Sequence, residues 1–202
     1  MIIGVCGYIG AGKSTIGNIL EAELNYVQLS FASVLKEIIS KLFCWDLEML
    51  QGLTDESRLW REQVDNKWSS ILGYPVTPRL MLERGGTEAC RNVFGDNIFV
   101  GHIKMRIDEI LTFKKNIVIT DCRFNNEFKL IESYENHKII HVYKDSTMTT
   151  WYNDYKSGVD VPDVVNLHKS KYEWIRNHFD IKLSNNSTID KLKELLLESL
   201  NY

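Results

Sequence analysis

Residues 7–14 read Gly-Tyr-Ile-Gly-Ala-Gly-Lys-Ser and match the pattern G-x-x-x-x-G-K-[ST], which is typical of phosphate-binding loops. A short apolar run at residues 2–6 precedes the match and predicts a buried strand. Residues 14–24 carry apolar side chains at helical spacing, so the expected order is strand, loop, helix. This context favours a phosphate-binding loop over a glycine-rich turn that fits the pattern by chance. It predicts a site for the phosphates of a nucleoside triphosphate.

The residue types in this loop suit phosphate chemistry. Glycine adopts positive φ easily, so the backbone can close around an anion. The exposed N–H groups and the N-terminus of the following helix then stabilise phosphate charge. We expect Lys13 to reach the β- and γ-phosphates and the Ser14 hydroxyl to hold Mg²⁺. The ATP-binding set expected in this loop is Gly10, Ala11, Gly12, Lys13, Ser14 and Thr15.

Composition narrows the class of protein. The 202 residues suit one domain, and 44% hydrophobic and 25% charged residues are ordinary for a globular protein. A net charge of −3 gives no basic footprint for a nucleic acid polymer. No apolar run approaches the length of a membrane span. The 4 cysteines form no C-x-x-C pair, and the chain enters its first expected strand at once, which favours a reduced, cytoplasmic protein.

Alternating patterns predict an α/β fold with a parallel sheet of roughly five strands, as in P-loop NTPases. Further strands are expected at residues 26–31, 116–121, 138–143 and 179–183. The whole chain, 1–202, is expected to form a single domain, with a core at about 1–31, 114–143 and 172–202. Residues 32–113 are mainly helical and form an insertion, and the polar, irregular stretch at 144–171 is expected to be a lid.

The strand at residues 116–121 ends in a carboxylate. Functional groups of parallel sheets gather beyond the carboxyl ends of the strands. We therefore expect Asp121 and Arg123 to lie beside the phosphate-binding loop, on the neighbouring strand. Asn125 is expected to cap the helix that follows.

The helical insertion concentrates arginine, whose guanidinium grips phosphate in a bidentate manner. This predicts a second anion site. For Arg58, Arg61 and Arg84, ordinary salt bridges with nearby glutamates explain the charge equally well. Lys36, near the start of the first inserted helix, is either a solvated surface lysine or a second phosphate contact.

For Arg79 and Arg91, the neighbouring residues predict an anion site more specifically. Thr77 suits an N-cap before Pro78, so Arg79 would sit in the first turn of a helix. Residues 85–86 are both glycine and are expected to break that helix, with Thr87 capping a second one. Two helix starts and two arginines would then converge on one anion. The acceptor-binding set is Lys36, Arg79, Gly86, Thr87, Glu88 and Arg91.

A phosphate-binding loop alone does not identify the reaction. A GTPase would carry D-x-x-G and N-K-x-D motifs, and the sequence has neither. A motor ATPase would be larger and more basic. A small-molecule kinase of this length, with an arginine-bearing insertion for its acceptor, fits best.

Four blocks resemble phage-type deoxynucleoside monophosphate kinases. Residues 78–91, PRLMLERGGTEACR, are similar to that family's P-R-x-x-L-Q-x-x-G-T-E-x-x-R. Residues 121–127, DCRFNNE, resemble D-x-R-F-x-N-E, and residues 168–170, HKS, match H-x-S-E in part. Residues 180–188 are similar to the closing I-x-N-D-G-T element. In departure from the family, Glu83 stands where glutamine is usual and Lys171 where the lid carries glutamate.

The resemblance implies ATP-dependent phosphorylation of deoxynucleoside monophosphates to diphosphates with Mg²⁺. Lys13, Asp121 and Arg123 would be catalytic, with Ser14 and Asp121 at the metal. Asn185 and Asn186 would contact adenine. The partners are then ATP and a monophosphate, and a homodimer is a further possibility.

Other readings stay open. The acceptor could be a hydroxyl, as in dephospho-coenzyme A kinases or nucleoside kinases, and Asp121 would then be a general base. It could also be a different phosphate, as in phosphomevalonate kinases. A nucleotide-binding module without turnover is the alternative from another class.

Overall fold

The computed structural model describes residues 1–201. It divides the chain into two compact units. The first unit comprises Met1–Phe31 and the chain from Ile103 onward, and the second unit is Ala32–His102. The expected phosphate-binding loop therefore lies in the first unit, and the arginine-rich block in the second.

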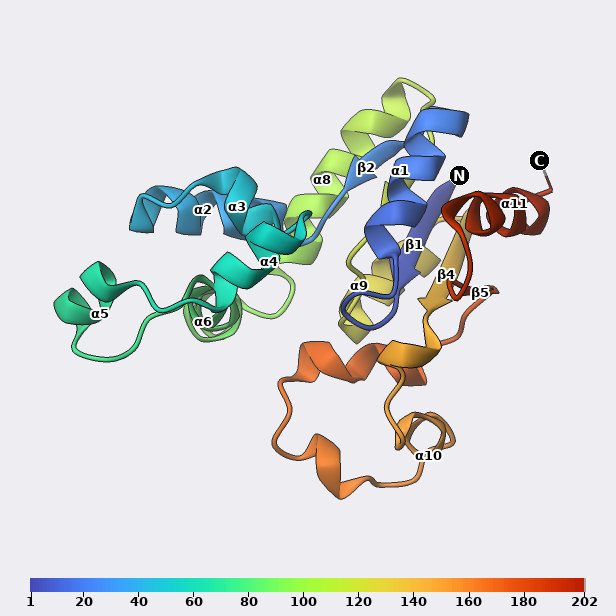
Figure 1. Ribbon diagram of the computed structural model, residues 1–202. Helices are drawn as coiled ribbons and strands as arrows, with labels where there is room; N and C mark the ends of the chain where they lie inside the picture. The colour runs from blue at the N-terminus through green and yellow to red at the C-terminus, as the bar shows by residue number, and fades with distance from the viewer. Residues whose placement is uncertain (202) are drawn as a thin grey trace. The chain divides into compact units, whose positions relative to one another are not determined.

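The first unit is built on a five-stranded parallel sheet with the strand order β2-β3-β1-β4-β5 (Figure 1). The strands are β1 (Ile2–Cys6), β2 (Val27–Leu29), β3 (Ile117–Ile119), β4 (His137–Tyr143) and β5 (Ile181–Ser184). The central strand β1 pairs on one side with β3 and on the other with β4. The predicted α/β fold with a five-stranded parallel sheet is confirmed.

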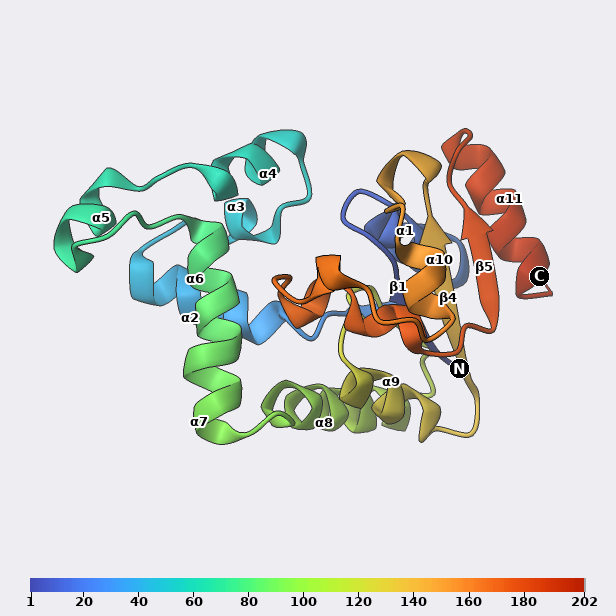
Figure 2. The ribbon, with the colours of Figure 1, turned by 90° about the horizontal axis from the view of Figure 1, so that it is seen from below.

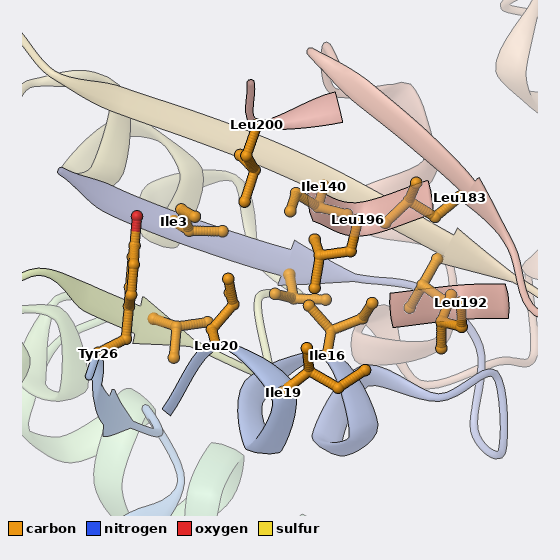
Figure 3. Packing of buried hydrophobic residues seen from close by; sticks show 13 residues of the cluster. Ile3, Ile16, Ile19, Leu20, Tyr26, Ile140, Leu183, Leu192, Leu196 and Leu200 are labelled. Carbon is orange, nitrogen blue, oxygen red and sulfur yellow. The ribbon is translucent and has the colours of Figure 1, made fainter. Parts of the chain in front are cut away.

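Helices cover both faces of this sheet, as they must where a parallel sheet is buried on both sides. On one face, α1 (Lys13–Leu24) and α11 (Ile189–Ser199) pack over β1 through the residues drawn in Figure 3, among them Ile3, Leu20 and Leu196. On the other face, α9 (Asn125–Glu132) comes so close that a Cβ on Gly4 would lie 2.5 Å from Ile131 Cδ1. The loop after β1 is thus anchored on a rigid, buried strand.

The stretch between β4 and β5, residues 144–180, is more ordered than its polar sequence predicts. It contains four short 3₁₀ helices and one α-helix, and several of its aromatic side chains are buried. These are η2 (Asp145–Thr147), α10 (Tyr152–Lys156), η3 (Pro162–Val164), η4 (Lys169–Lys171) and η5 (Glu173–Arg176). The stretch expected to be irregular at residues 144–171 thus contains short helices, and aromatic residues grouped at 151–155 and 172–179 supply its packing.

The second unit is helical around its own small core, and α8 (Ile98–Thr112) carries the chain from it into the first unit. Its core contains Leu35, Ile39, Phe43, Trp45 and Leu50. Its other elements are α2 (Ser33–Phe43), α3 (Leu47–Gln51), α4 (Asp55–Glu62), α5 (Asn66–Leu72), α6 (Pro78–Arg84), η1 (Gly85–Arg91) and α7 (Asn92–Phe94). Across residues 1–201, no helix is both long and apolar enough to cross a membrane.

Candidate active site

The phosphate-binding loop has a backbone that only glycine can adopt at its key positions. Gly7, Gly10 and Gly12 have φ angles of 143°, 82° and 110°, in the region that disfavours residues with a Cβ. A Cβ on Gly7 would lie 2.2 Å from the carbonyl oxygen of Val142, and one on Gly12 would lie 2.4 Å from Asn185 Nδ2. The loop is therefore closely packed against the end of β4, the neighbour of β1, and against the residue that follows β5.

Lys13 opens helix α1 directly after this loop. Its ammonium donates hydrogen bonds to the carbonyl oxygens of Gly7, at 2.9 Å, and Tyr8, at 2.8 Å. Burial, with a smaller contribution from the nearby Arg123 guanidinium, lowers the pKa of Lys13 from its ordinary value to about 7. An anion in the loop would favour the charged form, so this amine is poised for a phosphate.

Asp121 and Arg123 lie beside the loop, as their place after β3 predicts. The N–H of Cys122 donates to the Val5 carbonyl at 3.2 Å, which joins the end of β3 to the strand that leads into the loop. Asp121 accepts hydrogen bonds from the Ser30 hydroxyl at 2.7 Å and from the Phe31 N–H at 2.9 Å. Both carboxylate oxygens are thereby held in a fixed orientation, while the charges of Asp121 and Arg123 act on Lys13.

Glu127 fixes the turn that carries Arg123, a role the sequence analysis missed. Its side chain is buried, and Oε2 accepts from the N–H groups of Arg123 at 2.7 Å and Phe124 at 3.1 Å. The N-cap of α9 is Phe124, and Asn125 is its first residue, so the expectation that Asn125 caps this helix was wrong. Phe124 is not a usual capping residue, so the pattern of Ser, Thr, Asp or Asn followed three residues later by Glu does not point to Glu127.

The two asparagines after β5 contact protein atoms around the loop. Asn185 Nδ2 donates to the Ala11 carbonyl of the loop at 2.9 Å. Asn186 donates to the Ser184 hydroxyl at 2.9 Å and accepts from the Asp145 N–H at 2.9 Å. Asn185 thus supports the loop's shape, and contact of these residues with adenine stays a prediction.

Oxygen ligands for Mg²⁺ are available in this arrangement. Ser14 is exposed on the first turn of α1, and the Asp121 carboxylate is fixed on the neighbouring strand's end. No group of three or more His, Cys, Asp or Glu placed to bind a metal occurs within residues 1–201. Mg²⁺ in phosphotransfer sites uses one or two side chains plus substrate phosphates, so this donor set fits the ion.

The block at residues 78–91 in the second unit is helical from end to end. Thr77 Oγ1 accepts from the Leu80 N–H at 3.1 Å, which confirms Thr77 as the N-cap of α6. The glycine pair does not break the helix, and the predicted second helix start at Thr87 was wrong. Residues Gly85–Arg91 continue as the π-helix η1, and Figure 2 shows α6, η1 and α7 as one helical rod.

Gly85 and Gly86 allow close packing between this block and α2. A Cβ on Gly85 would lie 3.0 Å from Ile39 Cδ1, and one on Gly86 would lie 3.1 Å from Leu35 Cδ2, both on α2. Glycine therefore allows η1 to approach α2 closely. The π-helical turn also widens the backbone at this block, and such turns occur frequently at functional sites.

The candidate acceptor cations are held by partners in their own unit. Arg79 Nε donates to Glu62 Oε1 at 2.9 Å, and Lys36 Nζ donates to Gln51 Oε1 at 3.0 Å. The Arg91 guanidinium lies 4.8 Å from the centre of the Phe99 ring, and its Nη1 is 3.5 Å from the Gly86 carbonyl oxygen.

The expectation of salt bridges with nearby glutamates is confirmed for Arg84, whereas Arg58 pairs with an aspartate and Arg61 is buried. Arg84 pairs weakly with Glu88, at 3.8 Å, and Arg58 pairs with Asp55 at 2.7 Å. Arg61 is buried against Gly52, where a Cβ would lie 2.2 Å from the guanidinium carbon. The second unit therefore brings Arg91 and Gly86 together, and it places Thr87 and Glu88 on the same π-helix.

The similarities to known proteins extend over the whole chain. No protein-family model matches it. A curated protein of Acanthamoeba polyphaga mimivirus, named "Putative deoxynucleotide monophosphate kinase", is 26% identical over 214 residues, covering 100% of this chain and 96% of that protein. Among solved structures, this chain is similar to a dephospho-CoA kinase from Campylobacter jejuni with a TM-score of 0.49 and 15% identity, covering 99% of this chain and 95% of that one. A shikimate kinase from Aquifex aeolicus gives a TM-score of 0.45 and 12% identity, with 100% and 96% covered.

Proposed function

We propose that the protein transfers the γ-phosphoryl group of ATP to the phosphate of a deoxynucleoside monophosphate. The observation that carries phosphoryl transfer is the phosphate-binding loop, which ends at Lys13 and has the fixed Asp121 carboxylate beside it. The mimivirus relative supports the acceptor class, because it matches the whole chain and bears the name of such a kinase. The block at residues 78–91 supports it further by its resemblance to the same family.

The first unit supplies the donor site in this proposal. The N–H groups of residues 10–13 hold the β-phosphate, and Lys13 neutralises charge on the β- and γ-phosphates. Ser14 and Thr15 follow on the first turn of α1, and the Ser14 hydroxyl binds Mg²⁺. When bound, the ion neutralises charge on the phosphate oxygens. Asp121 would hold the ion together with Ser14, by orienting a water toward it.

The second unit supplies the acceptor site. Arg79 and Arg91 bind the acceptor phosphate, with Thr87 and Glu88 at the sugar or base. A phosphate monoester has a second pKa of about 6, so it is mostly dianionic at neutral pH and needs no strong general base. One of its oxygens forms the new bond to the γ-phosphorus while the bond to the β-phosphate oxygen breaks, and ADP leaves. Arg123 neutralises charge on the moving group.

Residues 32–102 are then the acceptor-binding insertion and residues 144–180 the lid of one kinase. A hydroxyl acceptor would require a base that abstracts a proton. Asp121 is the residue available for that, but hydrogen bonds to both of its oxygens suit an orienting role better.

The test is ADP formation from Mg·ATP with a panel of acceptors. The panel contains all ribo- and deoxyribonucleoside monophosphates, nucleosides, dephospho-coenzyme A and phosphomevalonate. We expect turnover with one or more deoxynucleoside monophosphates and none with hydroxyl acceptors. Lys13→Met, which should fold but lose turnover, controls for contaminating kinases, and Lys41→Met on the exposed side of α2 should keep it.

Turnover with hydroxyl acceptors alone would overturn the roles of Arg79, Arg91 and Asp121. If ATP binds but no acceptor is turned over, the protein is a nucleotide-binding module and the proposal fails.

A further inference from the structure

Tyr8, the second residue of the phosphate-binding loop, packs its side chain against the β4–β5 segment (residues 144–180). Its ring meets that of Trp174 edge to face, with centroids 5.1 Å apart, and that of Tyr152 at 6.2 Å. Its hydroxyl is hydrogen-bonded to the Thr149 hydroxyl at 2.8 Å. A residue that the loop pattern leaves variable is therefore held by three different side chains of this segment.

These aromatic side chains rest on the sheet at His141 of β4. The His141 ring is buried and lies 5.2 Å from Trp174 and 4.8 Å from Phe179, measured between centroids. Burial, with smaller effects of Lys182, Lys156 and Lys13, lowers its pKa to about 4, so the ring is neutral and packs as an aromatic side chain. The floor under the Tyr8 contact is thus aromatic and buried.

The backbone of Tyr8 meets the phosphate-binding machinery directly. Its carbonyl oxygen accepts the hydrogen bond from the Lys13 ammonium at 2.8 Å, and also one from the Ala11 N–H at 3.2 Å. A bound triphosphate competes with that carbonyl for the ammonium. A change in the hydrogen bonds of the Lys13 ammonium therefore acts on Tyr8, whose side chain contacts the β4–β5 segment.

The residues beside Trp174 are hydrogen-bonded to α9. Glu173 Oε1 accepts from the Asn125 N–H at 2.8 Å, and Asn177 Nδ2 donates to Asn125 Oδ1 at 2.9 Å. These bonds attach the segment to α9, directly after the turn that carries Arg123. The 3₁₀ helix that contains Trp174 thus contacts both the phosphate-binding loop, through Tyr8, and the start of α9, through Asn125.

We propose that Tyr8 is a positioning residue that couples nucleotide occupancy of the phosphate-binding loop to the position of the β4–β5 segment. The proposal rests on the proposed function in one respect, since it requires that the loop bind ATP. It adds a route by which the donor phosphates control the segment that is hydrogen-bonded to Asn125, and through it the turn that carries Arg123.

The test compares wild type with Tyr8→Phe, which removes the hydroxyl and keeps the ring. Hydrogen exchange of amides in the β4–β5 segment is measured with and without Mg·ADP, and Kd for the nucleotide by calorimetry. We expect exchange to change on nucleotide binding in wild type and to stay nearly constant in Tyr8→Phe. Nucleotide affinity should be retained, while kcat falls about 3- to 10-fold, the factor that one hydrogen bond supplies.

Thr149→Val should reproduce the effect, and the double variant should be no worse than either single one. Tyr134→Phe removes a tyrosine hydroxyl that donates to Asp108, remote from the loop, and controls for loss of a hydroxyl as such.

Three results would overturn the coupling. These are a response of the segment to nucleotide in Tyr8→Phe equal to that in wild type, single effects that add in the double variant, and a loss of nucleotide affinity as large as the loss of kcat. If wild type itself binds no nucleotide, the proposed function fails before the coupling is reached.

Discussion

The phosphate-binding loop and the acceptor block at residues 78–91 place positive charge for phosphate by opposite means. In the loop, three glycines with positive φ fix the backbone, and one lysine follows them. In the acceptor block, the backbone is helical throughout, and the charge comes from arginine side chains. The phosphate-binding loop therefore depends on backbone conformation, and the proposed acceptor site depends on side chains and what they are paired with.

The partners of these cations differ in charge. Lys13 is held by two neutral carbonyl oxygens, whereas Arg79 is held by the Glu62 carboxylate. A phosphate that enters the loop replaces neutral acceptors with an anion. A phosphate that binds Arg79 must compete with a carboxylate. We expect donor binding to be the stronger of the two for this reason.

The largest effect should come from matched glycine substitutions. Gly12→Ala puts a Cβ 2.4 Å from Asn185 Nδ2 at a φ of 110°, so ATP affinity should fall about 100-fold, given roughly 1–3 kcal/mol of backbone strain plus the clash. Gly86→Ala adds a Cβ 3.1 Å from the tip of the flexible Leu35 side chain. There the gain in helix propensity, about 1 kcal/mol, offsets the tight contact.

Calorimetry with Mg·ATP and thermal unfolding measure both variants. We expect Gly86→Ala to bind ATP as wild type does and to change the free energy of unfolding by no more than about 1 kcal/mol. Equal losses of ATP affinity in the two variants would contradict the difference drawn between the phosphate-binding loop and the block at residues 78–91.

Arg79→Ala tests whether the proposed acceptor site depends on an arginine side chain. KM for the monophosphate should rise roughly 30-fold and kcat should fall, because a hydrogen-bonded charge is worth about 1.5–3 kcal/mol. Kd for ATP should stay unchanged, and Arg58→Ala, which loses only a surface pair with Asp55, is the control. Glu62→Gln should lower KM slightly, since it frees Arg79 from a carboxylate. A parallel loss of ATP affinity in Arg79→Ala would refute the assignment.

The smallest effect is a pH dependence of ATP binding. Lys13 has a pKa of about 7 in the free protein, and bound phosphates raise it, so binding takes up a proton above pH 7. Affinity should therefore fall as pH rises, by roughly tenfold between pH 6.5 and 8.5. Calorimetry in buffers of different ionisation enthalpy detects the proton. In Lys13→Met this pH dependence should vanish, and its persistence would assign the proton to another group.

The sequence predicted best what depends on local pattern. The loop, the strand before it and the helix after it follow from glycine spacing and apolar periodicity. The carboxyl-end rule for parallel strands predicted the placement of Asp121 and Arg123 beside the loop. These features depend on residues that are close in sequence or on a general property of the sheet.

The rest depends on contacts between residues far apart in sequence. The glycines at 85–86 have turn composition, yet they allow close packing against α2, which no local pattern reveals. The β4–β5 segment looks polar in sequence, and its two groups of aromatic residues, at 151–155 and 172–179, have no helical or strand period that would predict their packing. The bond between Tyr8 and Thr149 joins residues 141 positions apart. The pairing of Arg79 with Glu62 likewise depends on how α4 meets α6.

The most direct test of the proposed reaction follows the γ-phosphorus itself. Phosphorus NMR of a mixture of Mg·ATP and the best deoxynucleoside monophosphate from the panel identifies where that group ends. We expect ADP and the deoxynucleoside diphosphate to appear in equal amounts, with the transferred group at the β-position. Release of inorganic phosphate alone, or a phosphate found on a hydroxyl, would contradict the account.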